Sequence, residues 1–133
     1  MADLFTLSAP ELAALLCSRV CHDIISPVGA INNGLELLDE GGADEDAMNL
    51  IRTSARNASA RLQFARIAFG AAGSAGMQID TGDAEAVAVA YVRNEKPDLE
   101  WVGKRVLLPK NKVKLILNLI LVGIGAIPRG GKI

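Results

Sequence analysis

A chain of 133 residues, half of them apolar, can bury one ordinary core or two small ones, which excludes intrinsic disorder as a description of the whole chain. Fourteen basic and fifteen acidic side chains leave a net charge of −1, so the broad positive field of a nucleic-acid-binding protein is absent. No basic stretch precedes an apolar run at the start, and the longest uncharged run, residues 115–128, is short for a membrane span. We therefore expect a cytoplasmic protein that binds neither nucleic acid nor membrane.

The first predicted helix begins at the segment Ser8-Ala9-Pro10-Glu11. A serine N-cap, a proline in the first turn and a glutamate three residues after the serine form a capping box. No stop signal occurs before Gly41-Gly42, so the helix could run about 30 residues, with Pro27 as an interior kink. Its apolar seam follows heptad spacing through Cys17, Val20, Ile24, Pro27, Ile31 and Leu38, widened by Leu35 and Leu37.

A second helix is predicted after three consecutive acidic residues at 44–46, whose negative charge favours a helix start. Glycines at positions 70, 73 and 76 predict its end. The spacing of its apolar seam alternates between three and four residues: Met48, Ile51, Ala55, Ala58, Leu62, Ala65 and Phe69.

Two such helices joined by a short turn form a hairpin, and one hairpin alone leaves much of both apolar stripes in water. A second copy would complete a two-fold symmetric four-helix bundle, in which Ala55, Ala58 and Ala65 allow close helix approach. The alternative is a monomer whose C-terminal part covers the stripe. We favour the homodimer because closed two-fold dimers are the commonest oligomers.

The C-terminal part reads as a small α/β unit. The pattern predicts strands over 77–80 and 99–102, a helix from Asp83 to about Arg93, and a very apolar helix from Asn111 to about Ile127. The last four residues look like the entry to another strand, which leaves open that the chain is part of something longer. The predicted fold class is α+β, with a helical hairpin over 1–76 and an incomplete α/β domain over 77–133.

His22 is the only histidine in the sequence. It falls at heptad position f, opposite the seam, so we expect its imidazole to point outward. Neutral imidazole is a competent nucleophile near neutral pH, and attack on an aspartyl phosphate would give a phosphoramidate that can pass the group on. The plain alternative is a surface histidine with no role. Its surroundings are small or polar, with two apolar exceptions, which leaves room for a protein partner: Arg19, Ile25, Ser26, Val28 and Gly29.

The segment His22-Asp23-Ile24-Ile25-Ser26-Pro27 resembles the H-box of bacterial sensor histidine kinases. The longer stretch CHDIISPVGAINNGLELL resembles the ChpT-type histidine phosphotransferases, which look like a kinase dimerisation hairpin followed by a degenerate ATPase-like domain. This resemblance implies that His22 accepts the phosphoryl group and that Asp23 assists or orients the imidazole. Ser26 would stand where related kinases carry a polar residue that influences dephosphorylation; alternatively it bonds its own backbone.

Residues 118–131 resemble the kinase N-box helix, with the asparagine, proline and paired glycines in register. The departures lie where nucleotide would bind: Val122 replaces the asparagine that holds Mg²⁺ in the family, and a valine offers no oxygen ligand. Gly125 and Ala126 replace a lysine and an aromatic residue. ATP-dependent autophosphorylation therefore looks lost, and a relay between receiver aspartates remains.

The resemblance also implies partners. The donor would be the receiver domain of a hybrid kinase such as CckA, and the acceptors would be response regulators such as CtrA and CpdR. We expect no cofactor of the chain's own, because the receiver can supply carboxylates and Mg²⁺. Arg19 would neutralise phosphate or contact an acidic receiver, unless it is a solvated surface arginine. The alternative functions are an ATP-using kinase fragment and a non-catalytic protein that binds a kinase or a receiver.

Two cysteines, Cys17 and Cys21, precede the histidine. Their spacing is one residue longer than the haem-attachment signature, and three candidate ligands do not close a structural zinc site. Buried, inert thiols are the expectation.

Overall fold

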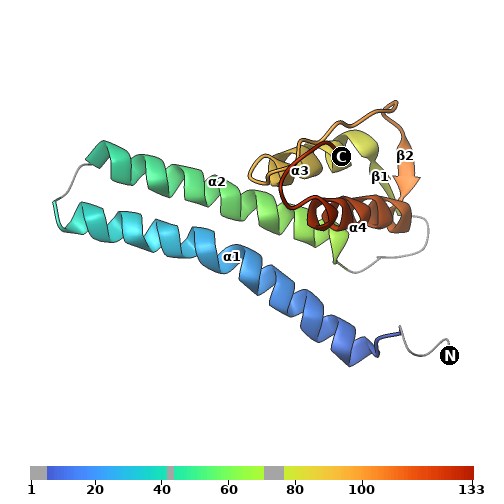
Figure 1. Cartoon of the computed structure of the whole chain (residues 1–133), viewed down its shortest axis with the longest axis horizontal. Coiled ribbons are helices and arrows are strands. Elements are labelled where there is room, and N and C mark those ends of the chain that lie inside the picture. Colours follow the sequence, from blue (N-terminus) through green and yellow to red (C-terminus); the bar gives the residue numbers. More distant parts are fainter. Residues whose placement is uncertain (1–5, 42–43, 71–76) are drawn as a thin grey trace. The chain divides into compact units, whose positions relative to one another are not determined.

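The computed structural model describes residues 6–41, 44–70 and 77–133, with Asp44 described by its backbone alone (Figure 1). This part of the chain contains four helices and one two-stranded sheet: α1 (Ala9–Asp39), α2 (Asp44–Ala68), β1 (Gln78–Asp80), α3 (Thr81–Val92), β2 (Leu107–Pro109) and α4 (Lys110–Ala126). Contacts divide the chain into two compact units, Met1–Ala58 and Ser59–Ile133, and the helix α2 runs from one into the other. The predicted class, helical with a small β component, is confirmed.

The start of α1 is the predicted capping box. The Ser8 hydroxyl accepts from the Glu11 amide, and the Glu11 carboxylate accepts from the Ser8 amide at 2.9 Å. The serine's hydrogen bonds, side chain first and backbone second, hold the pKa of Glu11 below its ordinary value. Pro27 lies inside the helix without ending it, as predicted, and is buried.

In the first unit, α1 packs against the beginning of α2 along much of the predicted seam. Val20, Ile24, Ile31 and Leu38 are half-buried and Pro27 is buried, but Cys17, Leu35 and Leu37 are exposed. Cys17 and Cys21 are both free and exposed in the single chain, so the expectation of buried thiols is wrong for this chain alone.

The two helices approach each other closely at Gly34. A Cβ at this position would lie 2.6 Å from Ile51 Cγ1 and 3.2 Å from the Ala47 carbonyl oxygen. Both Gly34 and Ala47 are buried, and neither was included in the predicted seams. Small residues at a helix crossing let the backbones approach, and a search for large apolar side chains overlooks them.

Along α2 the buried line departs from the strict heptad. Ala58 is buried and Ile51 half-buried as predicted, whereas Ala55 and Leu62 are exposed. In the single chain the neighbouring positions Ser54 and Phe64 are buried instead. The seam is predicted for a dimeric bundle, so the exposure of Ala55 and Leu62 in one copy does not test it. The buried residues of α2 are Ala47, Ser54, Ala58, Phe64 and Ala68.

The second unit forms its core where the end of α2 meets α3 and α4. Phe64 and Tyr91 stack with ring centroids 4.4 Å apart, and Leu117 is fully buried. The other buried members of this core are Ala68, Ala84, Ala88, Val92, Val113 and Ile120. Such a core stabilises the unit by removing apolar area from water.

The sheet of the second unit differs from the prediction. β1 pairs antiparallel with β2, in the register Gln78↔Pro109, Ile79↔Leu108 and Asp80↔Leu107. The predicted strand over 99–102 is wrong, because this stretch has no strand. The partner of β1 is instead β2, the short apolar segment just before α4. The strand β2 itself ends in Pro109 and is followed at once by a lysine-rich helix start, which obscured its pattern.

Residues 98–100 instead pair with the end of the chain. Asp98 forms a parallel bridge with Lys132, and the Ile133 amide donates to the Asp98 carbonyl oxygen at 2.9 Å. Gly130 and Gly131 have φ of 107° and 136°, a region that favours glycine. The last four residues, expected to enter a further strand, form this isolated bridge and no strand.

The helices of the second unit match their predictions within a few residues. The N-cap of α3 is Asp80, whose carboxylate accepts from the Gly82 amide, and not Asp83, which lies in the first turn. Gly42, Gly73 and Gly76, predicted at the turn and after α2, lie outside the described residues. The predicted domain boundary between 76 and 77 borders the same gap and stays a prediction.

Among the described residues, α1 is long and apolar enough to cross a membrane by length and composition, with a mean hydropathy of 1.3 in its best window. The longest uncharged run, residues 115–128, is too short for a span and is not the segment that meets this criterion. A single helix of this kind is weak support for a membrane span, since helices of soluble proteins pass the same test.

Candidate functional site

His22 lies near the middle of α1 on the side opposite the buried seam. Its side chain is 89% exposed, which confirms the outward orientation expected from its heptad position. The Nδ1 atom is the ring nitrogen near the next residue, 3.9 Å from Asp23 Oδ1. Nε2 is therefore at the other side of the ring, available to an approaching electrophile. The role of this imidazole as phosphoacceptor stays a prediction.

Asp23 shares its carboxylate between two neighbours on α1. Its Oδ2 accepts from Arg19 Nε at 3.1 Å, an i,i+4 pair, while Oδ1 faces the histidine. The side chain of Asp23 is 17% exposed and that of Arg19 is 45% exposed. Of the two alternatives for Arg19, neither included this pairing, although the four-residue spacing carries the signal.

The other predicted site residues surround His22 on the surface of α1. Ile25 is 71% exposed and Val28 is 42% exposed, so both apolar side chains are open to solvent beside the histidine. Ser26 is exposed, and a Cβ placed on Gly29 would meet nothing within 4 Å. The face around the histidine is thus open and partly apolar. Its predicted receiver-docking role is not tested by these contacts.

No three His, Cys, Asp or Glu side chains among the described residues are close enough to hold a metal ion. Cys17, Cys21 and His22 follow one another along α1 but do not form such a group. At this site one exposed imidazole lies beside a carboxylate.

The N-box-like asparagine has a structural role in the second unit. Asn118 Nδ2 donates to the carbonyl oxygens of Ala68, at 2.9 Å, and of Lys114, at 2.7 Å. The Lys114 ammonium donates to the Gly70 carbonyl oxygen. These side chains of α4 satisfy carbonyls at the end of α2 that have no partner inside that helix. Val122 is 67% exposed and offers no ligand.

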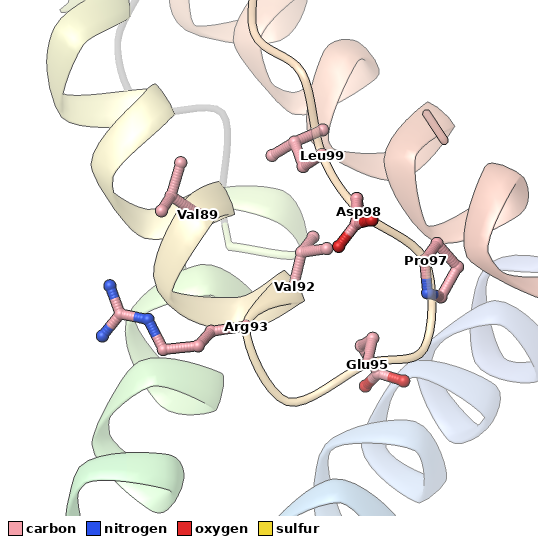
Figure 2. Close-up of a pocket in the computed structure, with 7 residues that line it drawn as sticks. All are labelled: Val89, Val92, Arg93, Glu95, Pro97, Asp98 and Leu99. Atoms are coloured by element: carbon pink, nitrogen blue, oxygen red, sulfur yellow. The ribbon is translucent and has the colours of Figure 1, made fainter. Parts of the chain in front are cut away.

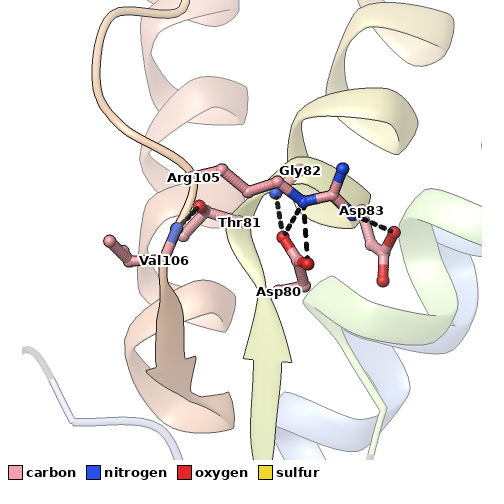
Figure 3. Close-up of polar contacts among 6 residues, drawn as sticks. All are labelled: Asp80, Thr81, Gly82, Asp83, Arg105 and Val106. Carbon is pink, nitrogen blue, oxygen red and sulfur yellow. Dashed lines mark hydrogen bonds and ion pairs between the residues drawn. The ribbon is translucent and has the colours of Figure 1, made fainter.

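A polar cluster joins the start of α3 to the chain before β2 (Figure 3). Arg105 Nε lies 2.8 Å from both oxygens of Asp80, and the Gly82 amide donates to Oδ1 at 2.7 Å. The arginine bonds, followed by the glycine amide, hold the pKa of Asp80 below its ordinary value. The same carboxylate raises the pKa of Arg105. Thr81 adds a hydrogen bond from the Val106 amide at 2.8 Å.

A pocket of about 290 Å³ lies between the end of α3 and the following loop (Figure 2). Its charged lining consists of Arg93, Glu95 and Asp98. With two carboxylates and one guanidinium in its lining, the pocket has too little positive charge for a nucleoside triphosphate. A second groove, of about 390 Å³, is lined largely by apolar side chains around Trp101, and neither pocket is lined by His22.

Comparison with known proteins identifies the class. The family model described as "Histidine phosphotransferase C-terminal domain" matches residues 81–133, which cover α3, β2 and α4. The second unit is therefore similar to the C-terminal domain of histidine phosphotransferases.

A particular relative extends the similarity to the hairpin. The chain is 80% identical over 128 residues to the protein phosphotransferase ChpT of Brucella abortus (strain 2308), covering 96% of this chain. A solved structure described as a bacterial phosphotransferase is 77% identical, with a TM-score of 0.82 over 96% of this chain. The chain is similar to the ChpT-type phosphotransferases, and the predicted resemblance is confirmed. It spans 61% of the length of the ChpT relative and 60% of the solved chain.

Proposed function

We propose that this chain acts as a histidine phosphotransferase in a bacterial phosphorelay. His22 accepts a phosphoryl group from the receiver aspartate of a hybrid kinase and passes it to the receiver aspartates of response regulators. The observation that carries this proposal is the 89% exposed imidazole of the H-box-like segment, in a chain 80% identical to a ChpT phosphotransferase.

The transfer step needs little from the protein beyond position. The lone pair of Nε2 attacks the phosphorus of the aspartyl phosphate, the N–P bond forms, and the P–O bond to the receiver carboxylate breaks. The receiver carboxylate leaves with the electron pair of that bond. Nδ1 keeps its proton, and Asp23 can accept a hydrogen bond from it after a small rotation of the exposed ring. Reversal of the same step delivers the group to a second receiver.

A relay is favoured over an ATP-dependent kinase because the N-box-like helix lacks groups for nucleotide. Asn118 is engaged with backbone carbonyls, and Val122 cannot coordinate a hard cation. We propose that the second unit is a degenerate ATPase-like domain and that Mg²⁺ is supplied by the receiver. Radiolabelled ATP mixed with this chain alone should leave no label on it; label at His22 would favour the kinase fragment instead.

We also propose that the hairpin works as a homodimer, in a four-helix bundle. Support comes from the large apolar side chains that α1 and α2 leave exposed in the single chain. Leu12 is 48% exposed, Leu15 is 56% exposed and Leu62 is 48% exposed. A second copy would remove these from water, which also offers an explanation for the apolar character of α1 without a membrane.

Receiver domains similar to those of CckA, CtrA and CpdR are the proposed partners, with Ile25 and Val28 as apolar contacts beside the histidine. Gly29 and Ser26 would let a receiver come close to α1. A cytoplasmic location, with neither nucleic acid nor membrane as partner, completes the proposal.

The test is a transfer assay with a receiver phosphorylated on its aspartate. Label should move to this chain and be acid-labile and base-stable, as expected of a phosphoramidate. The variant His22→Ala should take up none, whereas Arg52→Ala, changed at an exposed position of α2, should behave like the parent chain. If the receiver binds this chain but no label is transferred to it, the alternative function of a non-catalytic binding protein would be favoured.

A further inference from the structure

Arg19, Asp23 and His22 form a connected group on α1. The Asp23 carboxylate uses Oδ2 to accept from Arg19 Nε at 3.1 Å and turns Oδ1 toward His22 Nδ1 at 3.9 Å. The second distance is longer than a hydrogen bond. The carboxylate is 17% exposed, whereas the imidazole is 89% exposed, so the aspartate is the more fixed partner and the ring is free to rotate.

We infer that Arg19 is a positioning residue that holds the Asp23 carboxylate in the orientation from which Oδ1 can receive the Nδ1 proton of His22. This inference rests on the proposed phosphotransfer function. It gives Arg19 a task inside the chain, separate from contact with phosphate or with a receiver.

The consequence for chemistry lies in the tautomer of the imidazole. A neutral histidine carries its proton on one of the two ring nitrogens, and only the other nitrogen has a lone pair to attack phosphorus. A carboxylate directed at Nδ1 favours the Nδ1–H form and leaves the lone pair on Nε2. After transfer, the ring gains positive charge, which the same carboxylate stabilises. An arginine that fixes the carboxylate thus acts on both the free and the phosphorylated ring.

Geometry supports arginine in this role. At four residues before the aspartate it lies one helical turn away on the same face, where its guanidinium reaches Oδ2, and Oδ1 is the oxygen nearer the histidine. An exposed pair of this spacing contributes little to stability. Replacement of Arg19 should therefore change the tautomer population of the His22 imidazole without unfolding α1.

The test exploits the single histidine of the chain, whose ring nitrogens can be followed by ¹⁵N NMR without overlap from another imidazole. At a pH above the histidine titration, the full chain should show mainly the Nδ1–H tautomer, and Arg19→Ala should shift the population toward Nε2–H. Arg19→Lys should restore most of the parent pattern, since an ammonium can also bind Oδ2. Arg52→Ala serves as the control and should leave the pattern unchanged.

Transfer is then measured on the same four proteins. Arg19→Ala should slow the uptake of phosphoryl from a receiver by about tenfold, with Arg19→Lys closer to the parent. An Arg19→Ala chain with the parent's tautomer population would overturn the inference, whatever its transfer rate. Absence of transfer in the parent chain would instead count against the proposed function, because the tautomer measurement needs no partner.

Discussion

At the scale of single residues, the exposure of His22 could be predicted because heptad spacing assigns each position of a helix to a side. The contacts of this side chain could not be predicted in the same way. The spacing of Arg19 and Asp23 allows a pair, but the division of the carboxylate between arginine and histidine depends on side-chain rotation, which sequence does not encode. The Asp80–Arg105 pair joins residues 25 apart and had no local signal at all.

The Asp80 cluster predicts a pH dependence of stability. Because hydrogen bonds from Arg105 and Gly82 lower the folded-state pKa of Asp80 below its unfolded value, the carboxylate stabilises the fold above the ordinary aspartate range. That contribution should disappear as the pH falls through the folded pKa. Urea denaturation of the parent and Asp80→Asn chains, followed by Trp101 fluorescence, should show a stability difference at neutral pH that shrinks below about pH 4.

The control for this measurement is Glu85→Gln, which removes a carboxylate from α3 outside the Asp80–Arg105 cluster. Its stability difference from the parent should not follow the same pH course. An Asp80→Asn chain whose deficit is as large at the acid end as at neutrality would contradict the assigned role of the carboxylate.

At the scale of elements, the two long helices and their start signals could be predicted because capping and amphipathic periodicity are local properties. Ser54 and Phe64 are buried within the single chain although the predicted seam of α2 omits them, whereas Ala55 and Leu62 await the predicted second copy. Which face a helix buries depends on its partners, and small residues such as Gly34 are decisive there.

Glycine substitutions on α1 test the helix crossing. Gly34→Leu should lower the free energy of unfolding by roughly 1–3 kcal/mol, because the added side chain meets Ile51 and the Ala47 carbonyl. The matched variant Gly29→Ala adds a methyl group in open space and should raise the free energy by about 0.5–1 kcal/mol through helix propensity. Chemical denaturation followed by circular dichroism measures both, and similar responses at the two positions would contradict the close approach.

The position of Asn118 in an N-box-like helix could be predicted, but its hydrogen bonds to the end of α2 could not. Asn118→Ala should cost about 1–3 kcal/mol, because the half-buried carbonyl of Ala68 loses its donor. The exposed Asn111 at the start of α4 provides the control, and Asn111→Ala should change stability by a few tenths of a kcal/mol at most. Thermal unfolding measures both changes in stability. Equal losses of stability at the two asparagines would contradict the role of Asn118 as a donor to the Ala68 carbonyl.

At the scale of the whole molecule, the proposed bundle makes a prediction about mass. Sedimentation equilibrium should give twice the 14.0 kDa of one chain, because apolar side chains of the hairpin need a partner. Leu62→Glu, which places a charge in the proposed interface, should shift the mass toward one chain. Leu119→Glu, at an exposed position of α4, is the control and should leave the mass unchanged. A monomeric parent chain at tens of micromolar would contradict the dimer.

The central claim, that the exposed imidazole of His22 carries a phosphoryl group in transit between receivers, is tested most directly by ³¹P NMR of this chain mixed with an aspartate-phosphorylated receiver. The account predicts a phosphoramidate signal on Nε2 of His22 that disappears when an unphosphorylated second receiver is added. A spectrum that contains no signals besides acyl phosphate and inorganic phosphate would contradict it. A phosphoramidate signal that persists in a His22→Gln chain would also contradict it.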